Sequence, residues 1–333
     1  MNRRAFTKAA MATAATSLLG KANSTHAHSL NAPPPSATEE KKETMNLIDT
    51  HQHLWNRSQF TLPWVTKGTI LDNDFGIKEY KKATAGIGNI RTIYMEVDVD
   101  PTQQWAEAQF VNGLCQDPES GMVAAVVSGR PASPEFDEWA TKLKTLPGIR
   151  GIRQVLHVKE TPKGFCLGEQ FVKSMKILGE KDLSFDLCIR DVDLPETSKL
   201  VGLCPDTRFI LDHCGNPDLK KTDLEPWKKD LAEIAKHKNL VIKISGFLAS
   251  AAAKDQWKYE DAATIVNHCL DSFGPDRCIF GGDWPVVLLG STLATWIETL
   301  KKIVANRPAA DQAKLFYQNA ERIYRVNPIK AGA

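Results

Sequence analysis

The chain has 333 residues, of which 42% are hydrophobic and 25% are charged. These proportions are typical of a globular protein with a sizeable core, and they exclude a disordered, coiled-coil or collagen-like chain. The 42 Lys and Arg against 40 Asp and Glu give a net charge of +2, and no basic stripe carries interleaved aromatic residues. We therefore expect a small-molecule substrate and no nucleic acid partner.

Residues 1–27 have the pattern of an export signal of the twin-arginine type. Arg3 and Arg4 precede a short apolar run, 9–19, which small residues follow. The run is about half of the ~20 residues that a transmembrane helix needs, so we expect export to the periplasm with cleavage and no stable membrane anchor. The export machinery is then one partner of the chain. Cleavage after residue 27 removes four basic residues and no acid, which changes the net charge from +2 to −2.

Residues 28–45 hold three prolines and a Glu-Glu-Lys-Lys-Glu run, which predicts a disordered linker before a folded domain at 46–328 and a short tail at 329–333. The seven cysteines are an odd number and widely spread. We expect them to be small buried hydrophobic residues and not disulfide partners.

Short runs rich in Ile, Val, Leu and Phe recur through the domain and predict eight strands. They are Leu47–His53, Arg91–Val97, Met122–Ser128, Ile149–His157, Ser184–Ile189, Arg208–His213, Leu240–Ser245 and Cys278–Asp283. Spacers with helical patterning include Trp105–Leu114, Phe136–Leu146, Glu169–Leu178, Leu231–His237, Ala262–Phe273 and Thr292–Val304. This alternation predicts a single α/β domain, a closed (β/α)8 TIM barrel, with an open doubly wound sheet as the alternative. No Gly-rich nucleotide loop follows any strand, which counts against the open sheet.

Catalytic side chains of such a barrel belong at the carboxyl ends of its strands. The polar residues at or just after the predicted ends are His51, His53, Glu96, His157, Arg190, His213 and Asp283. Alternation along a strand sends His51 and His53 to the same face, where two imidazoles can grip one divalent metal or one carbonyl oxygen. Asp283 ends a buried apolar run, where an ionised carboxylate needs a partner, a hydrogen bond or a metal.

The sequence resembles the amidohydrolase superfamily, in the amidohydrolase 2 branch that includes lactonases acting on L-fuconolactone, L-rhamnonolactone and 2-pyrone-4,6-dicarboxylate. The resemblance lies in six segments spread in order through the domain and in a C-terminal match at Asn319–Tyr324. The six segments are Ile48–Trp55, Gly148–Gln154, Phe185–Leu187, Leu211–Pro217, Lys243–Gly246 and Phe280–Val286.

The resemblance implies a hydrolase whose catalytic and metal-binding residues are His51, His53, His213 and Asp283. Many relatives add a carboxylated Lys or a Glu on strand four and a His on strand five as metal ligands. Here strand four offers Arg150, Arg153, Gln154 and His157, and strand five ends in Cys188-Ile189-Arg190. A two-metal site is therefore not expected, which leaves one divalent metal, zinc in the first place, or catalysis without a metal.

The expected reaction is hydrolysis of a lactone, with a sugar-acid lactone as the leading candidate. Asp283 would activate water, and the three histidines, directly or through a metal, would stabilise the oxyanion. Candidate substrate-binding residues are Arg153, Gln154, His157, Arg190 and Glu96, with Trp55, Trp64 and Trp284 as an apolar wall.

Two other functions remain open at this point. Non-oxidative decarboxylases of the same superfamily use a similar His and Asp set with one metal, and a non-catalytic sugar-binding barrel would also carry these residues. A homodimer is a further possibility, because barrels of this kind often form dimers.

Overall fold

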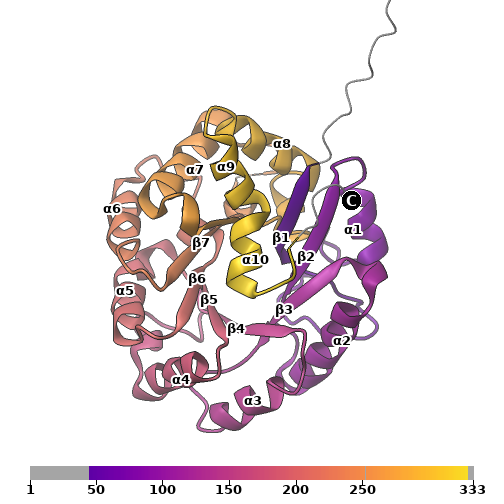
Figure 1. Ribbon diagram of the computed structural model, residues 1–333, viewed down its shortest axis with the longest axis vertical. Helices are drawn as coiled ribbons and strands as arrows, with labels where there is room; N and C mark the ends of the chain where they lie inside the picture. The colour runs from indigo at the N-terminus through magenta and orange to yellow at the C-terminus, as the bar shows by residue number, and fades with distance from the viewer. Residues whose placement is uncertain (1–44, 252, 329–333) are drawn as a thin grey trace, which may run out of the picture. The chain divides into compact units, whose positions relative to one another are not determined.

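The structure is a computed structural model that describes residues 45–251 and 253–328. The predicted export signal, the linker up to residue 44 and the tail at 329–333 lie outside the described residues. Eight parallel strands form one sheet in chain order, and helices surround it (Figure 1). The predicted (β/α)8 barrel is confirmed and the open sheet is wrong, because the order has no reversal point.

The strands are β1 (Asn46–Gln52), β2 (Asn89–Met95), β3 (Met122–Ser128), β4 (Ile149–Val155), β5 (Ser184–Cys188), β6 (Arg208–Leu211), β7 (Leu240–Ile244) and β8 (Cys278–Phe280). The α-helices are α1 (Ile77–Ala83), α2 (Gln104–Gln116), α3 (Phe136–Leu143), α4 (Glu169–Glu180), α5 (Leu194–Leu203), α6 (Glu225–Ile234), α7 (Tyr259–Phe273), α8 (Leu293–Val304), α9 (Ala309–Ala313) and α10 (Asn319–Tyr324).

Several strands end earlier than the sequence predicts. β6 ends at Leu211 and β8 at Phe280, so His213 and Asp283 lie in the following loops and not in strands. Both residues have a positive φ, 54° in each case, which a strand does not allow. The polar residues still follow the carboxyl ends of the strands, which is the edge where the sequence places them.

The barrel closes between β1 and the segment after β8. Gln52 forms an isolated parallel bridge with Trp284, and the His53 amide donates to the Trp284 carbonyl at 2.8 Å. The Thr50 hydroxyl donates to the Phe280 carbonyl at 2.6 Å, and the Gly282 amide donates to Asp49 Oδ1 at 2.6 Å. These bonds join the chain's two most distant strands and fix His53 and Asp283 on neighbouring segments.

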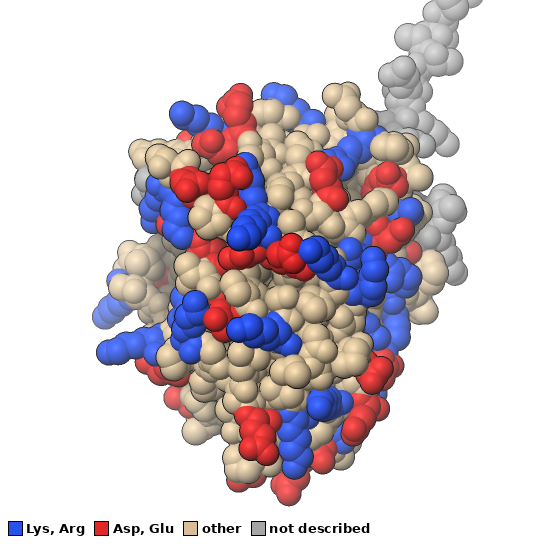
Figure 2. Space-filling view, turned by 90° about the vertical axis from the view of Figure 1, so that its left-hand side faces the viewer, with Lys and Arg blue, Asp and Glu red and all other residues tan. Residues whose placement is uncertain are grey.

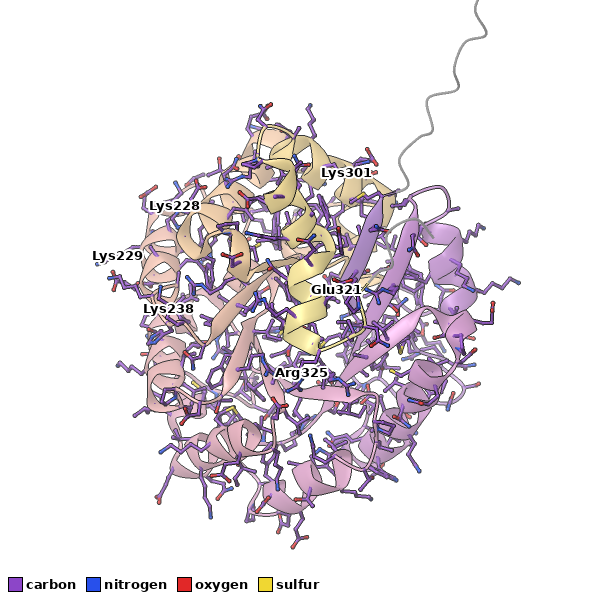
Figure 3. The ribbon with its side chains drawn as sticks, in the orientation of Figure 1. Lys228, Lys229, Lys238, Lys301, Glu321 and Arg325 are labelled. Atoms are coloured by element: carbon purple, nitrogen blue, oxygen red, sulfur yellow. The ribbon has the colours of Figure 1, made fainter. Side chains whose placement is uncertain are left out.

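The barrel interior is apolar at one end. Alternation sends Ile93 of β2, Ile210 of β6 and Ile279 of β8 inward, where they form a separate buried cluster with Ile323 of α10. Figure 1 shows α10 lying across the middle of the ring, so this helix closes the amino-terminal end of the barrel. An ion pair of 2.8 Å between Arg91 of β2 and Glu321 ties α10 in place, and Figure 3 shows Glu321 near the centre of the ring.

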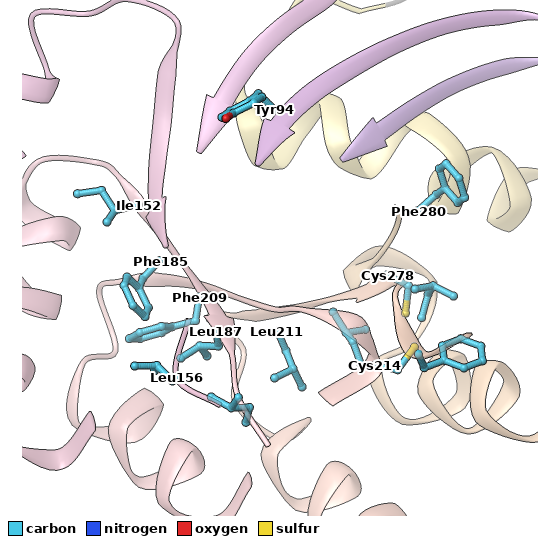
Figure 4. Close-up of a cluster of buried hydrophobic side chains, with 14 of the residues drawn as sticks. Tyr94, Ile152, Leu156, Phe185, Leu187, Phe209, Leu211, Cys214, Cys278 and Phe280 are labelled. Atoms are coloured by element: carbon cyan, nitrogen blue, oxygen red, sulfur yellow. The ribbon is translucent and has the colours of Figure 1, made fainter. Parts of the chain in front are cut away.

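A larger core lies between the strands and the surrounding helices. Phe185 and Leu187 of β5 and Phe209 and Leu211 of β6 point out of the barrel into this layer (Figure 4). All four are fully buried. The same alternation directs Asp186 and Asp212 inward. Because the apolar side chains must face the helices, their positions determine which polar side chains face the barrel interior.

On the face that Figure 2 shows, acidic and basic side chains are interspersed, without a field of one sign. Of the described helices, none has the length and apolar character that a membrane crossing requires. All seven cysteines lie in the described residues and are free thiols, and all but Cys115 are buried, as the sequence predicts.

Candidate active site

A bulge in β1 turns His51 into the barrel. Ile48 faces the interior, yet Asp49 and Gln52 pair with Thr92 and Tyr94 of β2, so one extra residue lies between them. The extra residue reverses the alternation, and His51 becomes fully buried inside the barrel. The ring centroids of His51 and His53 are 4.9 Å apart, so both imidazoles lie in one cluster.

The tautomer of His53 follows from its backbone contacts. Its Nδ1 lies 3.0 Å from the Met95 carbonyl oxygen and 3.1 Å from that of Glu96. Carbonyl oxygens only accept, so Nδ1 carries the proton and the neutral ring has a lone pair on Nε2. This Nε2 lies 3.4 Å from Asp283 Oδ1. A histidine oriented by carbonyls in this way is typical of a metal ligand.

His51 lies between two cations. Arg153 Nη1 is 3.3 Å from its Nε2, and Lys243 Nζ is 3.4 Å from its Nδ1. A neutral imidazole accepts at only one nitrogen, so one contact is a hydrogen bond and the other a close approach. Burial, with Lys243 and the neighbouring His213, holds the pKa of His51 well below its ordinary value despite the nearby Asp212. His51 is therefore neutral.

His213 and Asp283 complete the cluster from the loops after β6 and β8. The His213 ring lies 4.4 Å from the His51 ring, and its Nδ1 lies 3.1 Å from Ser245 Oγ. Asp283 is 2% exposed, and its Oδ1 lies 3.7 Å from His51 Nε2. Because the hydroxyl of Ser245 both donates and accepts, His213 can present either an N–H or a lone pair on Nε2.

The donor set fits one divalent cation. Ligand atoms of His51, His213 and Asp283 all lie within 4.8 Å of one another, and His53 directs its Nε2 lone pair at the same carboxylate. A carboxylate oxygen and an imidazole lone pair facing each other repel unless a cation or a proton lies between them. Two histidine nitrogens and a carboxylate with an open position are a common catalytic zinc arrangement.

Arg153 enters the cluster from β4 and is held by Glu96. Its Nε lies 2.7 Å from Glu96 Oε1, and its Nη2 donates to the Glu96 carbonyl at 2.8 Å. Burial raises the pKa of Glu96, but Arg153 and a hydrogen bond from Ser128 outweigh it and leave the pKa below its ordinary value. The third nitrogen, Nη1, remains directed at His51 and at Asp212, 3.5 Å away.

A buried ion cluster that the sequence interpretation left without a role lies behind His51. Lys243 Nζ is 2.5 Å from Asp186 Oδ2 and 3.1 Å from Asp212 Oδ1. All three side chains are fully buried. Burial by itself raises the pKa of Asp212, but Lys243 and His51 hold it well below its ordinary value. The signal was present: each charge interrupts an apolar strand or follows one directly, where an ion needs a partner.

A cavity of about 320 Å³ opens above the cluster at the carboxyl ends of the strands. His53, His213 and Asp283 lie at its floor together with Arg153, and His157 and Trp64 lie in its wall. A larger hollow of about 670 Å³ lies near α1 and the start of β2. It is remote from the histidines, so the smaller cavity is the candidate site, as expected for a barrel enzyme.

Five of the residues predicted to bind substrate are absent from the described lining of this cavity. Glu96 is fully buried behind Arg153. Gln154 alternates with Arg153 and Val155 on β4, so its side chain faces away from the interior. Arg190 is bound by Asp193, 2.5 Å away, and by the Thr161 carbonyl at 2.9 Å.

The other two residues that do not line the cavity are tryptophans. Trp55 is 2% exposed and packs against Phe75 with ring centroids 5.1 Å apart. Trp284 is also 2% exposed and packs on Phe75 and Tyr80. Both belong to the core beside α1. Of the three tryptophans predicted to form an apolar wall, only Trp64 is among the described residues that line the cavity, and 40% of its surface is exposed.

The chain is similar in sequence and in fold to known proteins. The chain is 26% identical over 288 residues to an L-fucono-1,5-lactonase of Burkholderia multivorans, with 83% of this chain and 95% of that protein covered. It is 25% identical over 297 residues to the protein y4mH of Sinorhizobium fredii, which covers 84% of this chain and 98% of the relative. A crystal structure of an amidohydrolase from B. multivorans with bound zinc has a TM-score of 0.76 and 24% identity, with 85% of this chain and all of that chain covered. The amidohydrolase family model Amidohydro_2 matches residues 48–326, and the chain belongs to this family of hydrolases.

Proposed function

We propose that this hydrolase opens a lactone. The observation that carries the proposal is Asp283, a carboxylate 2% exposed whose Oδ1 faces Nε2 of His53 at 3.4 Å on the floor of the cavity. The two lactonase relatives, each 26% identical to this chain, support hydrolysis of the same type of bond. They make L-fuconolactone the reference sugar-acid lactone.

In the proposed reaction, Asp283 takes a proton from a water molecule, and the oxygen of that water attacks the lactone carbonyl carbon. The ring C–O bond then breaks, and the alkoxide that leaves takes the proton back from Asp283. The product is the open hydroxy acid. Asp283 begins and ends the cycle as a carboxylate, so no further acid is required.

Two groups on the cavity floor are placed to stabilise the negative charge on the carbonyl oxygen. Arg153 Nη1 is held in position because Nε and Nη2 of the same guanidinium bind Glu96 at 2.7 and 2.8 Å. His213 presents an N–H at Nε2 when Ser245 donates to its Nδ1. Fixed donors of this type contribute about a hundredfold or more to acyl transfer.

A zinc ion held by His51, His213 and Asp283, with His53 beside them, would supply polarisation of the carbonyl as a Lewis acid. The crystal structure of the B. multivorans amidohydrolase holds zinc, which supports testing this ion first. The donation by Arg153 does not depend on a metal, so activity without zinc is compatible with the proposal.

The test is hydrolysis of a panel of lactones, followed with a pH indicator, by the wild type, Asp283→Asn and Asp206→Asn, each with and without a chelator. Asp206 is an exposed acid before β6, at the opposite end of the barrel. We expect kcat of Asp283→Asn to fall about a hundredfold or more, and Asp206→Asn to retain wild-type turnover. No turnover on any lactone, with CO2 release from an aromatic acid that the chelator abolishes, would favour a decarboxylase instead.

A further inference from the structure

Most of the cavity wall above the reacting groups is apolar. Six of the apolar side chains come from the strand ends and loops around the mouth: Trp64, Val97, Val155, Val158, Phe247 and Val286. Phe247 is 1% exposed and is fixed by an edge contact with Trp296, with ring centroids 5.4 Å apart. Binding against such a wall is favourable for the hydrocarbon groups of a ligand, because they leave water. It is not favourable for hydroxyl groups, which find no hydrogen-bond partner there.

Three polar side chains of the wall donate to the chain's own backbone. Asn216 Nδ2 donates to a backbone carbonyl at 2.6 Å, and Ser250 Oγ donates to another at 2.7 Å. Trp64 Nε1 donates to a third at 2.7 Å. These donors are therefore not free for the hydroxyl groups of a sugar, which would lose their hydrogen bonds to water on entering the cavity.

The charges of the cavity disfavour an anionic substrate. Arg153 is the one Lys or Arg among the described lining residues, and Glu96 neutralises it at 2.7 Å. Asp98 and Asp218 also line the cavity, beside Asp283. Asp98 is 2.8 Å from Arg130, which binds it from outside the cavity. A carboxylate on the substrate would meet an excess of acids, and the one guanidinium nitrogen that Glu96 leaves free, Nη1, serves the carbonyl oxygen in the proposed reaction.

We propose that the substrate of this site is an uncharged lactone carrying an alkyl or aryl substituent, which the apolar wall receives while the ring lies over Asp283. The proposal rests on the lactone hydrolysis proposed above and names its substrate class. A cavity of about 320 Å³ is at the small end of ligand pockets, which run from roughly 300 to 1,000 Å³, so the substituent is short. The preference runs against carboxylated and polyhydroxylated lactones.

The test compares kcat/KM of the wild-type protein on five compounds: the unsubstituted six-membered lactone, the same ring with a pentyl chain, the same ring with a phenyl group, L-fuconolactone, and a six-membered lactone bearing a carboxylate. We expect the pentyl or phenyl compound to exceed both L-fuconolactone and the carboxylated lactone by about tenfold or more. A higher value for L-fuconolactone or the carboxylated compound would overturn the substrate class but leave lactone hydrolysis standing. Absence of turnover on all five would overturn both.

Two variants test whether the wall is responsible. Val155→Thr keeps the shape of a half-buried side chain and replaces one methyl group with a hydroxyl, and Phe247→Ala removes a ring. We expect each to lower kcat/KM for the pentyl lactone about fivefold relative to the unsubstituted lactone. Loss of folding lowers both values together and leaves their ratio unchanged, so Val155→Thr provides the test if Phe247→Ala is unstable. An unchanged ratio in folded Val155→Thr would contradict the proposal.

Discussion

The ammonium group of Lys243 lies 2.5 Å from the carboxylate of Asp186, and both side chains are fully buried in the barrel. Asp212 lies 3.1 Å from the same ammonium, so one cation serves two acids. Burial raises the pKa of Asp186 against the lowering effect of Lys243. Lys243 therefore compensates the charge of both acids in the ion cluster that contacts His51.

Replacement of Lys243 by Met tests this dependence. The variant leaves two buried acids without their shared cation, and we expect the free energy of unfolding to fall by about 3–5 kcal/mol. Urea denaturation measures the loss. The double variant Lys243→Met, Asp186→Asn removes one of the stranded charges and should recover part of the stability. A double variant no more stable than Lys243→Met would show that the pair is not coupled as the distance indicates.

Gly246 leaves room for His213. It has a φ of +74°, and a Cβ built on it would lie 1.9 Å from His213 Nδ1. We expect Gly246→Ala to displace the imidazole and to lower kcat about tenfold or more, since small displacements of reacting groups have large effects on rate. Hydrolysis of the best lactone of the panel measures the effect.

Gly164 provides the matched control. Its φ is +82° and its ψ is −1°, against +74° and −32° for Gly246, and a Cβ there meets nothing within 4 Å. Gly164→Ala therefore has a similar backbone strain, about 1 kcal/mol, without the clash. We expect similar losses of stability from backbone strain in the two variants and a loss of turnover in Gly246→Ala alone. Equal turnover in both would contradict the role of Gly246.

Zinc binding should depend on His53, because two backbone carbonyls fix its Nδ1 proton and leave the Nε2 lone pair beside Asp283. We expect His53→Asn to weaken zinc binding by about tenfold or more, measured by equilibrium dialysis and elemental analysis. His237→Asn is the control, since His237 contacts Ser198 at 2.9 Å on the helical layer. A wild-type affinity for zinc in His53→Asn would show that His53 is not a zinc ligand. If the wild-type protein binds no zinc, the proposed metal site is wrong.

The fold could be predicted because its signal is local. Runs such as Met122–Ser128 are both apolar and bounded by glycines, and their repetition with helical spacers favours a barrel without knowledge of any contact. The positions of His51, His53, His213 and Asp283 at one end follow from the same periodicity. Strand ends were less predictable, because His213 and Asp283 have left-handed backbone conformations that the apolar pattern does not reveal.

Side-chain direction could not be predicted where it depends on contacts between distant segments. The bulge that turns His51 inward arises from the pairing of β1 with β2. Arg190 has the residue type for substrate binding, but Asp193 holds it away from the cavity. Glu96 follows a strand end as expected, yet its partner is Arg153 of another strand. Each of these outcomes is set by tertiary packing and not by the local sequence.

The stability of the protein should also depend on pH through Glu107 of α2. This acid is fully buried, and its Oε1 accepts hydrogen bonds from Tyr94 and from the Val97 amide, each of 2.9 Å. Its Oε2 has no hydrogen-bond partner among the described residues. Burial, together with the negative charge of Glu96, raises the pKa of Glu107 from 4.5 to about 7.

A raised pKa means that the folded protein keeps this proton where the unfolded chain has released it. The contribution of Glu107 to stability is therefore greatest below about pH 4.5 and is lost as the pH rises through about 7. Glu107→Gln keeps an acceptor at Oε1 and removes the ionisation. We expect the stability of Glu107→Gln relative to the wild type to rise by on the order of 2 kcal/mol between pH 5 and pH 8, measured by urea denaturation. Glu138→Gln, at an exposed acid of α3, is the control and should show no such trend. A stability difference between Glu107→Gln and the wild type that stays constant with pH would contradict this prediction. It would mean that Glu107 is ionised in the folded protein throughout this range.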